Sequence, residues 1–177
     1  MSFPVFASGD VLNASDMNAV GLWLVKSQTI GTGVSSVTVT GAFSADYDSY
    51  RITFQGGTSS ASANVGFQLN GITGSNYQMY GYYGGWGIAT LNGYSPAVGT
   101  SWVDLSPSST TGYGWQLDIH SPFLSSRKFG RVVGWSTAGI HELSLTCTST
   151  TSATGFTLTP LSGTLTGGTV RVYGYKN

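Results

Sequence analysis

Hydrophobic and polar residues alternate with a period of two from Val25 to the end of the chain. This alternation is typical of β-strands that bury one face and expose the other. Gly, Asn, Ser and Pro separate the alternating runs, as expected for turns. About eight to ten short strands at this spacing predict an all-β fold, an antiparallel β-sandwich or jelly roll. The clearest runs are 37–41, 50–55, 67–69, 117–119, 143–145, 156–158 and 170–173.

A glycine pair interrupts the last of these regions. Gly167 and Gly168 separate residues 163–166 from residues 169–175, and both segments have the strand pattern. Two-residue turns that need positive φ favour glycine. We therefore expect a tight β-hairpin at this pair.

The first 24 residues have a different pattern, which predicts one short helix. Asn13 can cap it, and Asp16 follows three residues later, where a carboxylate can bond back to the cap. Leu12 and Met17 have the spacing of a hydrophobic staple. The apolar stripe of the helix consists of Met17, Val20 and Leu24.

A helix this short is marginal in water, so it needs a surface on its own domain, a sister subunit or another protein. The preceding Phe3-Pro4-Val5-Phe6 is either an arm that lies on a neighbour or a tail folded back. We therefore divide the chain into an arm and anchoring helix, residues 1–24, and a β-sandwich domain, residues 25–177. The candidate anchoring residues are Phe3, Phe6, Leu12, Met17, Val20 and Leu24.

The charge content narrows the possible partners. Only 8% of the 177 residues are charged, whereas about 25% is usual in soluble domains. Seven Lys and Arg balance seven Asp and Glu, and zero net charge favours association. We expect self-association, with a hydroxyl-rich monomer as the alternative. The balance argues against nucleic acid as a partner, and no apolar run reaches the roughly 18 to 20 residues that insert across a membrane.

Candidate catalytic residues are few. Ser136 lies in the run G-W-S-T-A-G, which misses G-x-S-x-G by one residue and has a strand context rather than a strand-to-helix turn. The single cysteine, Cys147, alternates with Leu143 and Leu145, so we expect it to face inward as a small apolar side chain. The sequence therefore predicts no catalytic residue, no cofactor and no enzymatic activity.

Candidate metal ligands are equally sparse. Asp118 and His120 share a predicted strand face, and His141 is the only other histidine, so no tight ligand cluster is visible. Asp46 and Asp48 have the spacing for calcium, but turn chemistry explains aspartates there without a metal. We predict no metal site.

Two surface candidates remain. Five aromatic residues lie in one Gly-spaced stretch, where they can stack on the sugar rings of a glycan or pack in the core or at a subunit contact. They are Tyr77, Tyr80, Tyr82, Tyr83 and Trp86. A basic cluster of Arg127, Lys128 and Arg131 can contact an acidic glycan or a neighbouring subunit, or form an ordinary solvated loop.

Three segments resemble virion structural proteins of tailed bacteriophages. The start of the chain, over residues 6–18, reads F-A-S-G-D-V-L-N-A-S-D-M-N. It is similar to the opening of these proteins, which has an apolar residue, then a turn of the Gly-Asp-Val-Leu type, then a short helix. The run A-F-S-A-D-Y-D-S-Y-R-I over 42–52 resembles their first core strand, and G-G-T-V-R-V-Y-G-Y over 167–175 resembles their closing strand. The resemblance implies a trimeric β-sandwich attached to the particle through its N-terminus.

The expected function is that of a virion structural protein, a homotrimeric tail-fibre module for host attachment that adheres to a receptor. The alternative is a capsid decoration protein, of the cement or head-fibre type, attached through its N-terminal arm. A glycan-degrading enzyme is the third class. The expected partners are sister subunits, other phage virion proteins and a host surface glycan. The protein would be made in the cytoplasm of the host bacterium and then belong to the virion.

Overall fold

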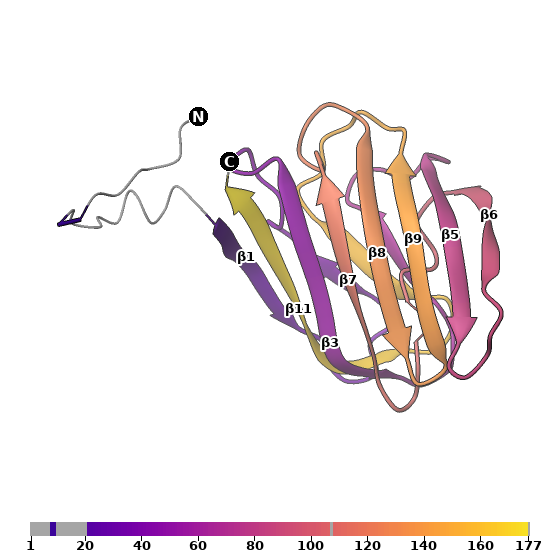
Figure 1. Cartoon of the computed structure of the whole chain (residues 1–177). Helices are drawn as coiled ribbons and strands as arrows, with labels where there is room; N and C mark the ends of the chain where they lie inside the picture. Colours follow the sequence, from indigo (N-terminus) through magenta and orange to yellow (C-terminus); the bar gives the residue numbers. More distant parts are fainter. Residues whose placement is uncertain (1–7, 10–20, 107, 177) are drawn as a thin grey trace.

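The computed structural model describes residues 8–9, 21–106 and 108–176, and these residues form two antiparallel β-sheets that face each other (Figure 1). The predicted all-β antiparallel fold is confirmed, and the facing sheets fit a sandwich. The described part of the chain contains no helix. A jelly roll, which has eight strands in two Greek keys, is not confirmed, because the strands divide into sheets of eight and three.

The large sheet has the strand order β1-β11-β3-β7-β8-β9-β5-β6. Its strands are β1 (Gly21–Thr29), β3 (Ser49–Ser59), β5 (Tyr77–Gly85), β6 (Asn92–Gly99), β7 (Tyr113–His120), β8 (Lys128–Ser136), β9 (Gly139–Cys147) and β11 (Leu165–Lys176). The small sheet has the order β2-β10-β4. Its strands are β2 (Val37–Val39), β4 (Val65–Leu69) and β10 (Phe156–Pro160).

The hydrophobic core lies between the two sheets. Alternate residues of the central strands point into it, as the period of two predicts. Phe43 contacts both sides, because its ring lies 4.9 Å from that of Tyr50 in β3 and 5.8 Å from that of Phe156 in β10. Phe156 stacks in turn on Phe67 of β4, at a centroid distance of 4.5 Å. These buried rings join the sheets.

Residues 101–106 extend the small sheet beside β4 and bring Trp102 into the core. Phe67 and Trp102 exchange backbone hydrogen bonds of 2.7 and 3.0 Å. The Trp102 indole N–H also lies 3.1 Å from the carbonyl oxygens of Gln78 in β5 and Thr146 in β9. One buried side chain therefore connects the extension of the small sheet to two strands of the large sheet.

Strand β1 begins within the segment predicted to be a helix. Residues 21–24 pair with β11, from Gly21 opposite Lys176 to Leu24 opposite Tyr173. The helix prediction is therefore wrong for Leu24, because backbone pairing along the edge of the large sheet outweighs a weak helical pattern. The other candidate anchoring residues, Phe3, Phe6, Leu12, Met17 and Val20, lie outside the described residues.

The predicted hairpin at the glycine pair is also wrong. Gly167 and Gly168 have positive φ, but they lie within one continuous strand, β11. A Cβ atom on Gly168 would lie 2.7 Å from both the backbone nitrogen of Gly57 and the Phe54 ring. Both positions need glycine for their positive φ, and Gly168 also lies where β11 approaches β3 too closely for a side chain.

Lys128, at the start of β8, is fully buried. Its ammonium group donates hydrogen bonds to the carbonyl oxygens of Ser126 at 2.7 Å, Ser149 at 3.0 Å and Thr151 at 2.6 Å. Burial lowers the pKa of the ammonium group by desolvation. The side chain thus joins the loop before β8 to the loop after β9.

We predict that Lys128→Met lowers the free energy of unfolding by about 2–4 kcal/mol, because three backbone carbonyl groups lose their shared charged donor while the apolar volume is kept. The matched control is Arg127→Met at the exposed neighbouring position, which should change stability by less than about 0.5 kcal/mol. Denaturant unfolding of the three proteins measures both effects. Equal stability of the two variants would contradict this role of Lys128.

Candidate functional site

Strand β5 places two of the five candidate aromatic residues on the outer face of the large sheet, away from the small sheet. Tyr80 pairs with Ser144 of β9, and Tyr82 pairs with Glu142. Directly paired residues share a face of the sheet. Tyr80 is 65% exposed, and Tyr82 is also exposed. Their rings are therefore available to a partner.

Tyr77 does not belong to this surface, so its candidacy as a glycan contact is wrong. Its side chain is buried, and its ring meets that of Trp102 edge to face at 5.2 Å. The hydroxyl donates to the Ile72 carbonyl at 2.9 Å and accepts from the Leu69 N–H at 3.0 Å. The alternation along β5 turns Tyr77 to the core and Tyr80 to solvent.

Tyr83 and Trp86 do not lie with Tyr80 and Tyr82 on the outer face of the large sheet. Tyr83 pairs with His141 on the inner face of the sheet, near its edge, and is partly exposed. Trp86 lies in the turn after β5 and is 59% exposed, with its indole N–H donating to the Ser136 carbonyl at 2.7 Å. The aromatic stretch is thus not one continuous platform.

A shallow groove of about 570 Å³ lies on the outer face between β5, β6, β8 and β9, and we call it the outer groove. A glycine leaves it open, because a Cβ atom on Gly93 would meet no atom within 4 Å. Tyr80 and Tyr82 contribute its aromatic wall. The lining residues are Tyr80, Gly81, Tyr82, Gly93, Arg131, Glu142, Leu143 and Ser144.

An ion pair provides the polar groups of the outer groove. Glu142 accepts a hydrogen bond from the Arg131 guanidinium at Oε1 and another from the Tyr82 hydroxyl at Oε2, at 2.5 Å. The Arg131 side chain is 69% exposed, whereas that of Glu142 is mostly covered. No other charged residue lines the outer groove. It therefore offers fixed donors and acceptors with no net charge.

A second hollow of about 340 Å³ continues from the outer groove along the sheet. Both hollows are lined by Tyr80 and Ser144, and the second also includes Gln78 and the exposed ring of Phe129. Phe129 lies two residues from Arg131 on β8, a spacing of roughly 7 Å along a strand. Together the hollows can receive a ligand longer than a single ring.

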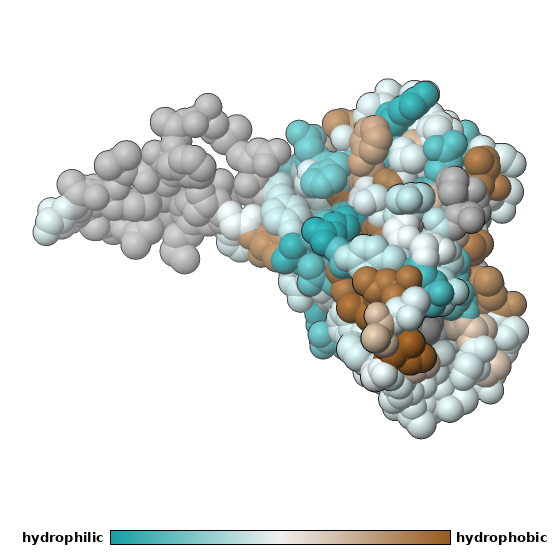
Figure 2. Space-filling model, turned by 45° about the vertical axis from the view of Figure 1, so that its right-hand side comes forward, coloured by the Kyte–Doolittle hydropathy of each residue, from teal (hydrophilic) through white to brown (hydrophobic). Residues whose placement is uncertain are grey.

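Apolar residues also gather at the end of the β5–β6 hairpin. Trp86, Ile88 and Leu91 are exposed there. Ile88 and Leu91 lie against the backbone of β5, since Cβ atoms on Gly85 and Gly84 would fall about 3 Å from them. Brown apolar groups alternate with pale, weakly polar ones over the side of the molecule in Figure 2.

The predicted basic cluster is not a single surface. Arg127 is exposed in the loop before β8, Lys128 is buried, and Arg131 pairs with Glu142 in the outer groove. The three residues are neighbours in sequence, but alternation along the strand and the burial of Lys128 separate them. They do not form a cationic patch for an acidic glycan.

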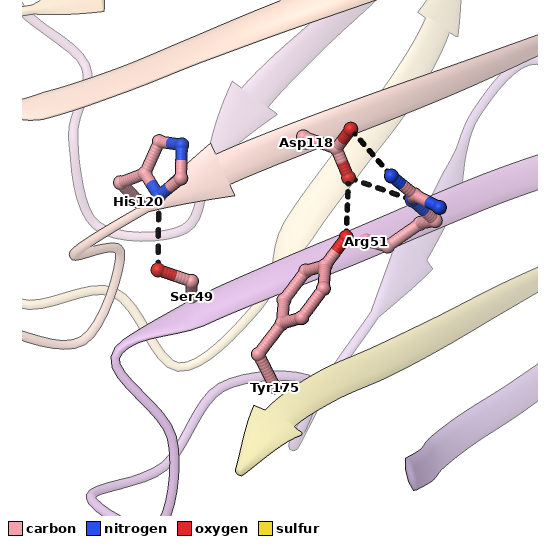
Figure 3. Close-up of polar contacts among 5 residues, drawn as sticks. All are labelled: Ser49, Arg51, Asp118, His120 and Tyr175. Atoms are coloured by element: carbon pink, nitrogen blue, oxygen red, sulfur yellow. Dashed lines mark hydrogen bonds and ion pairs between the residues drawn. The ribbon is translucent and has the colours of Figure 1, made fainter. Parts of the chain in front are cut away.

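Asp118 and His120 do share a face of β7, and both take part in polar contacts across neighbouring strands (Figure 3). Asp118 accepts from the Arg51 guanidinium at 2.8 and 2.9 Å and from the Tyr175 hydroxyl at 3.1 Å. His120 Nδ1 lies 2.9 Å from the Ser49 hydroxyl oxygen. These contacts hold β3, β7 and β11 together at the surface.

The remaining candidate catalytic and metal-binding residues are buried or hydrogen-bonded within the fold. Cys147 is buried, as expected, and burial raises the pKa of its thiol. Ser136 is buried and its hydroxyl accepts from the Ala138 N–H at 3.0 Å. Asp46 accepts from the Ser44 hydroxyl at 2.9 Å within a turn.

Among the described residues, no group of three or more His, Cys, Asp or Glu side chains is placed to hold a metal ion. In the same part of the chain, no helix has the length and hydrophobicity to cross a membrane.

Sequence reasoning missed a polar cluster on the inner face, near the β6 edge, in which His141 and Asp104 are buried. The rings of Tyr83, Tyr94 and His141 lie 5.0 to 5.7 Å from one another. Tyr94 hydrogen-bonds the carboxylate of Asp104, which also accepts from the Asn64 side chain. These residues come from β5, β6, β9 and two loops, so no sequence spacing could reveal the cluster.

Burial shifts the titration of this cluster in opposite directions. Desolvation lowers the pKa of His141, partly offset by a hydrogen bond to the Asp104 backbone. Desolvation also raises the pKa of the Asp104 carboxyl, partly offset by the bond from Tyr94. His141 Nδ1 is buried without a hydrogen-bond partner among the described atoms. The folded protein therefore favours neutral His141.

We predict that His141 weakens the fold in acid. Because its folded-state pKa lies below the unfolded value of about 6.5, its contribution is complete above that pH and is lost as pH falls toward the folded-state pKa. The unfolding free energy of the wild type should fall relative to His141→Gln between pH 7 and 5, by at most about 1.4 kcal/mol per pH unit. Asp104 is present in both proteins and cancels in the difference. His120→Gln, at the exposed histidine, is the control, and parallel pH profiles of wild type and His141→Gln would contradict the prediction.

The outer groove combines exposed aromatic rings, hydrogen-bonding groups and a hollow. A hollow of about 450 Å³ lined by Trp135, Thr111 and Thr137 has a similar composition, but no charged residue lines it. In the cluster around His141, the side chains of His141 and Asp104 are buried on the inner face, away from the outer groove. No model of a known protein family matches the chain, and no curated protein matches it.

Proposed function

We propose that this chain is a structural protein of a bacteriophage virion, a homotrimeric adhesion module that binds a host surface glycan through the outer groove. The observation that carries the binding role is the exposed Tyr80 ring beside the Arg131–Glu142 pair. A sugar ring presents an apolar C–H face for stacking and hydroxyl groups that both donate and accept. The outer groove offers a partner for each.

The surroundings of the outer groove support a carbohydrate over a charged macromolecule. No Asp, Glu, Lys or Arg occurs from residue 52 to residue 103, a segment that includes all of β4, β5 and β6. Electrostatic attraction to nucleic acid or to a charged protein needs a field of one sign. Tyrosine and hydroxyl side chains around a neutral groove suit a ligand rich in hydroxyl groups.

The virion assignment draws on the resemblance of two segments that are adjacent in the fold. Residues 42–52 lead into β3, and residues 167–175 lie in β11, which pairs with β3 along its length. The Tyr47 ring lies on Gly174, where a Cβ atom would fall within 2.6 Å of the ring. Arg51 and Tyr175 meet at Asp118. The two motifs thus form one packed unit within the large sheet.

Assembly is proposed through the β1 edge. Leu22, Trp23 and Leu24 are consecutive exposed apolar residues on a strand whose outer edge has no neighbour among the described strands. An apolar edge strand favours pairing with another chain. This edge lies at the opposite side of the large sheet from β5 and β6 (Figure 1), so assembly there leaves the outer groove free.

Capsid decoration is the second candidate, and the same β1 edge favours it. Strand β1 follows the N-terminal segment in sequence, so the two segments together can bind the capsid surface instead of a sister subunit. The number of copies per purified particle separates the two roles, because a tail carries a handful and a shell carries tens to hundreds.

We expect Tyr80→Ala to weaken binding to host cells, because the exposed ring is lost, with a change in unfolding free energy below about 0.5 kcal/mol. Tyr80→Phe keeps the ring and should keep binding. Trp86→Ala tests the separate aromatic site at the hairpin. Binding of folded protein to cells is the measurement; wild-type binding by Tyr80→Ala would remove the outer groove as the receptor site.

Sedimentation tests assembly. The wild type should sediment as a trimer at micromolar concentration, and Leu24→Lys should shift it toward monomer by placing a charge on the β1 edge. Val98→Lys is the matched control, since Val98 is an equally exposed aliphatic residue on the other edge strand, β6. A trimer that survives Leu24→Lys, or one broken by Val98→Lys, would place the contact elsewhere.

A further inference from the structure

We propose that the outer groove selects neutral pyranosides and discriminates against sugars that carry a carboxylate, such as uronic acids. This inference rests on the proposed function and names its ligand class. The inference follows from the ion pair of the outer groove, in which Arg131, the one cation among the lining residues, already binds Glu142. Arg131 alone would suit an anionic sugar, but Glu142 lies on the same guanidinium.

The carboxylate of Glu142 is held in place from both sides. Arg131 donates to Oε1 and the Tyr82 hydroxyl donates to Oε2. A carboxylate has about four acceptor sites and a guanidinium has five donors, so both groups keep capacity for a ligand. Two neighbouring sugar hydroxyls can donate to Glu142 and accept from Arg131.

The exclusion of anions follows from the same pair. A ligand carboxylate close enough to accept from Arg131 also approaches Glu142, so attraction and repulsion oppose each other. No second cation lines the outer groove to compensate. A neutral hydroxyl has no such conflict, because it can act as donor to one partner and as acceptor to the other.

The aromatic positions set the size of the ligand. Tyr80 stands between the outer groove and the adjoining hollow, and Phe129 lies at the far side of that hollow. The Arg131 and Phe129 rows of the sheet are roughly 7 Å apart along the strand, so the two hollows together are longer than one pyranose ring. The ligand class is therefore a neutral oligosaccharide with one pyranose on Tyr80 and the next toward Phe129.

The test compares probes that differ only in charge. Methyl glucoside and methyl glucuronide form one pair, and methyl galactoside and methyl galacturonide form the other. Each is titrated into the full-length protein labelled with ¹⁵N, and amide shifts give the affinity. The neutral member of at least one pair should bind about tenfold more tightly than its acid, with shifts centred on β5 and β9.

Two variants change the charge of the outer groove by one unit in opposite directions. Glu142→Gln should weaken binding of the neutral sugar and strengthen binding of the uronide, so that the preference narrows or inverts. Arg131→Gln should weaken both and leave the uronide disfavoured. Gly93→Leu should block every probe, because a side chain there projects into the open groove without backbone strain. Thermal melting shows that each variant is folded.

Uronides that bind as tightly as the neutral glycosides, or a preference unchanged by Glu142→Gln, would overturn the inference. Absence of binding by all four probes would overturn it too. The proposed function is judged separately, by whether Tyr80→Ala abolishes binding to host cells. If it does while the probes fail, the groove is an adhesion site for another ligand class; if cell binding is also unaffected, both proposals fall.

Discussion

The contact between the two sheets decides the role of every strand face in this protein. Phe67 and Phe156 of the small sheet stack on each other, and the adjoining rings of Phe43 and Trp102 contact Tyr50 and Tyr77 of the large sheet. Once that face is buried, the alternation along each strand sends every second residue to the opposite face. Among the described residues, three strands and a loop cover the large sheet on one side, and its outer face is left without a second layer.

The outer groove is a direct consequence of this arrangement. Tyr80, Arg131 and Glu142 lie on three adjacent strands and reach the same place because their register aligns them. The rigid sheet holds their backbone positions, so little order has to be gained on binding. On the inner face, the same alternation buries His141, and the loop before β7 places the buried Asp104 beside it. The proposed binding site and the buried histidine thus lie on opposite faces of β9.

Local pattern was sufficient to predict the fold class but not the pairing of the strands. The period of two identified most core strands and the inward side of Cys147, because a strand that buries one face has an apolar side chain at every second residue. It could not reveal that Gly167 and Gly168 serve a close approach to Gly57, since that contact joins residues over a hundred positions apart. Nor could it place Leu24, whose strand depends on β11 as a partner. Among the site residues, the tyrosines were visible as a stretch, but the pairing of Arg131 with Glu142 requires the turn between β8 and β9.

A crystal structure of the full-length protein with a bound neutral oligosaccharide tests the central claim most directly. The account predicts one sugar ring on Tyr80, with hydroxyl groups between Arg131 and Glu142, the next ring toward Phe129, and an outer groove that no sister subunit covers. A sugar bound instead at the β5–β6 hairpin, or a second subunit packed over the outer groove, would contradict it.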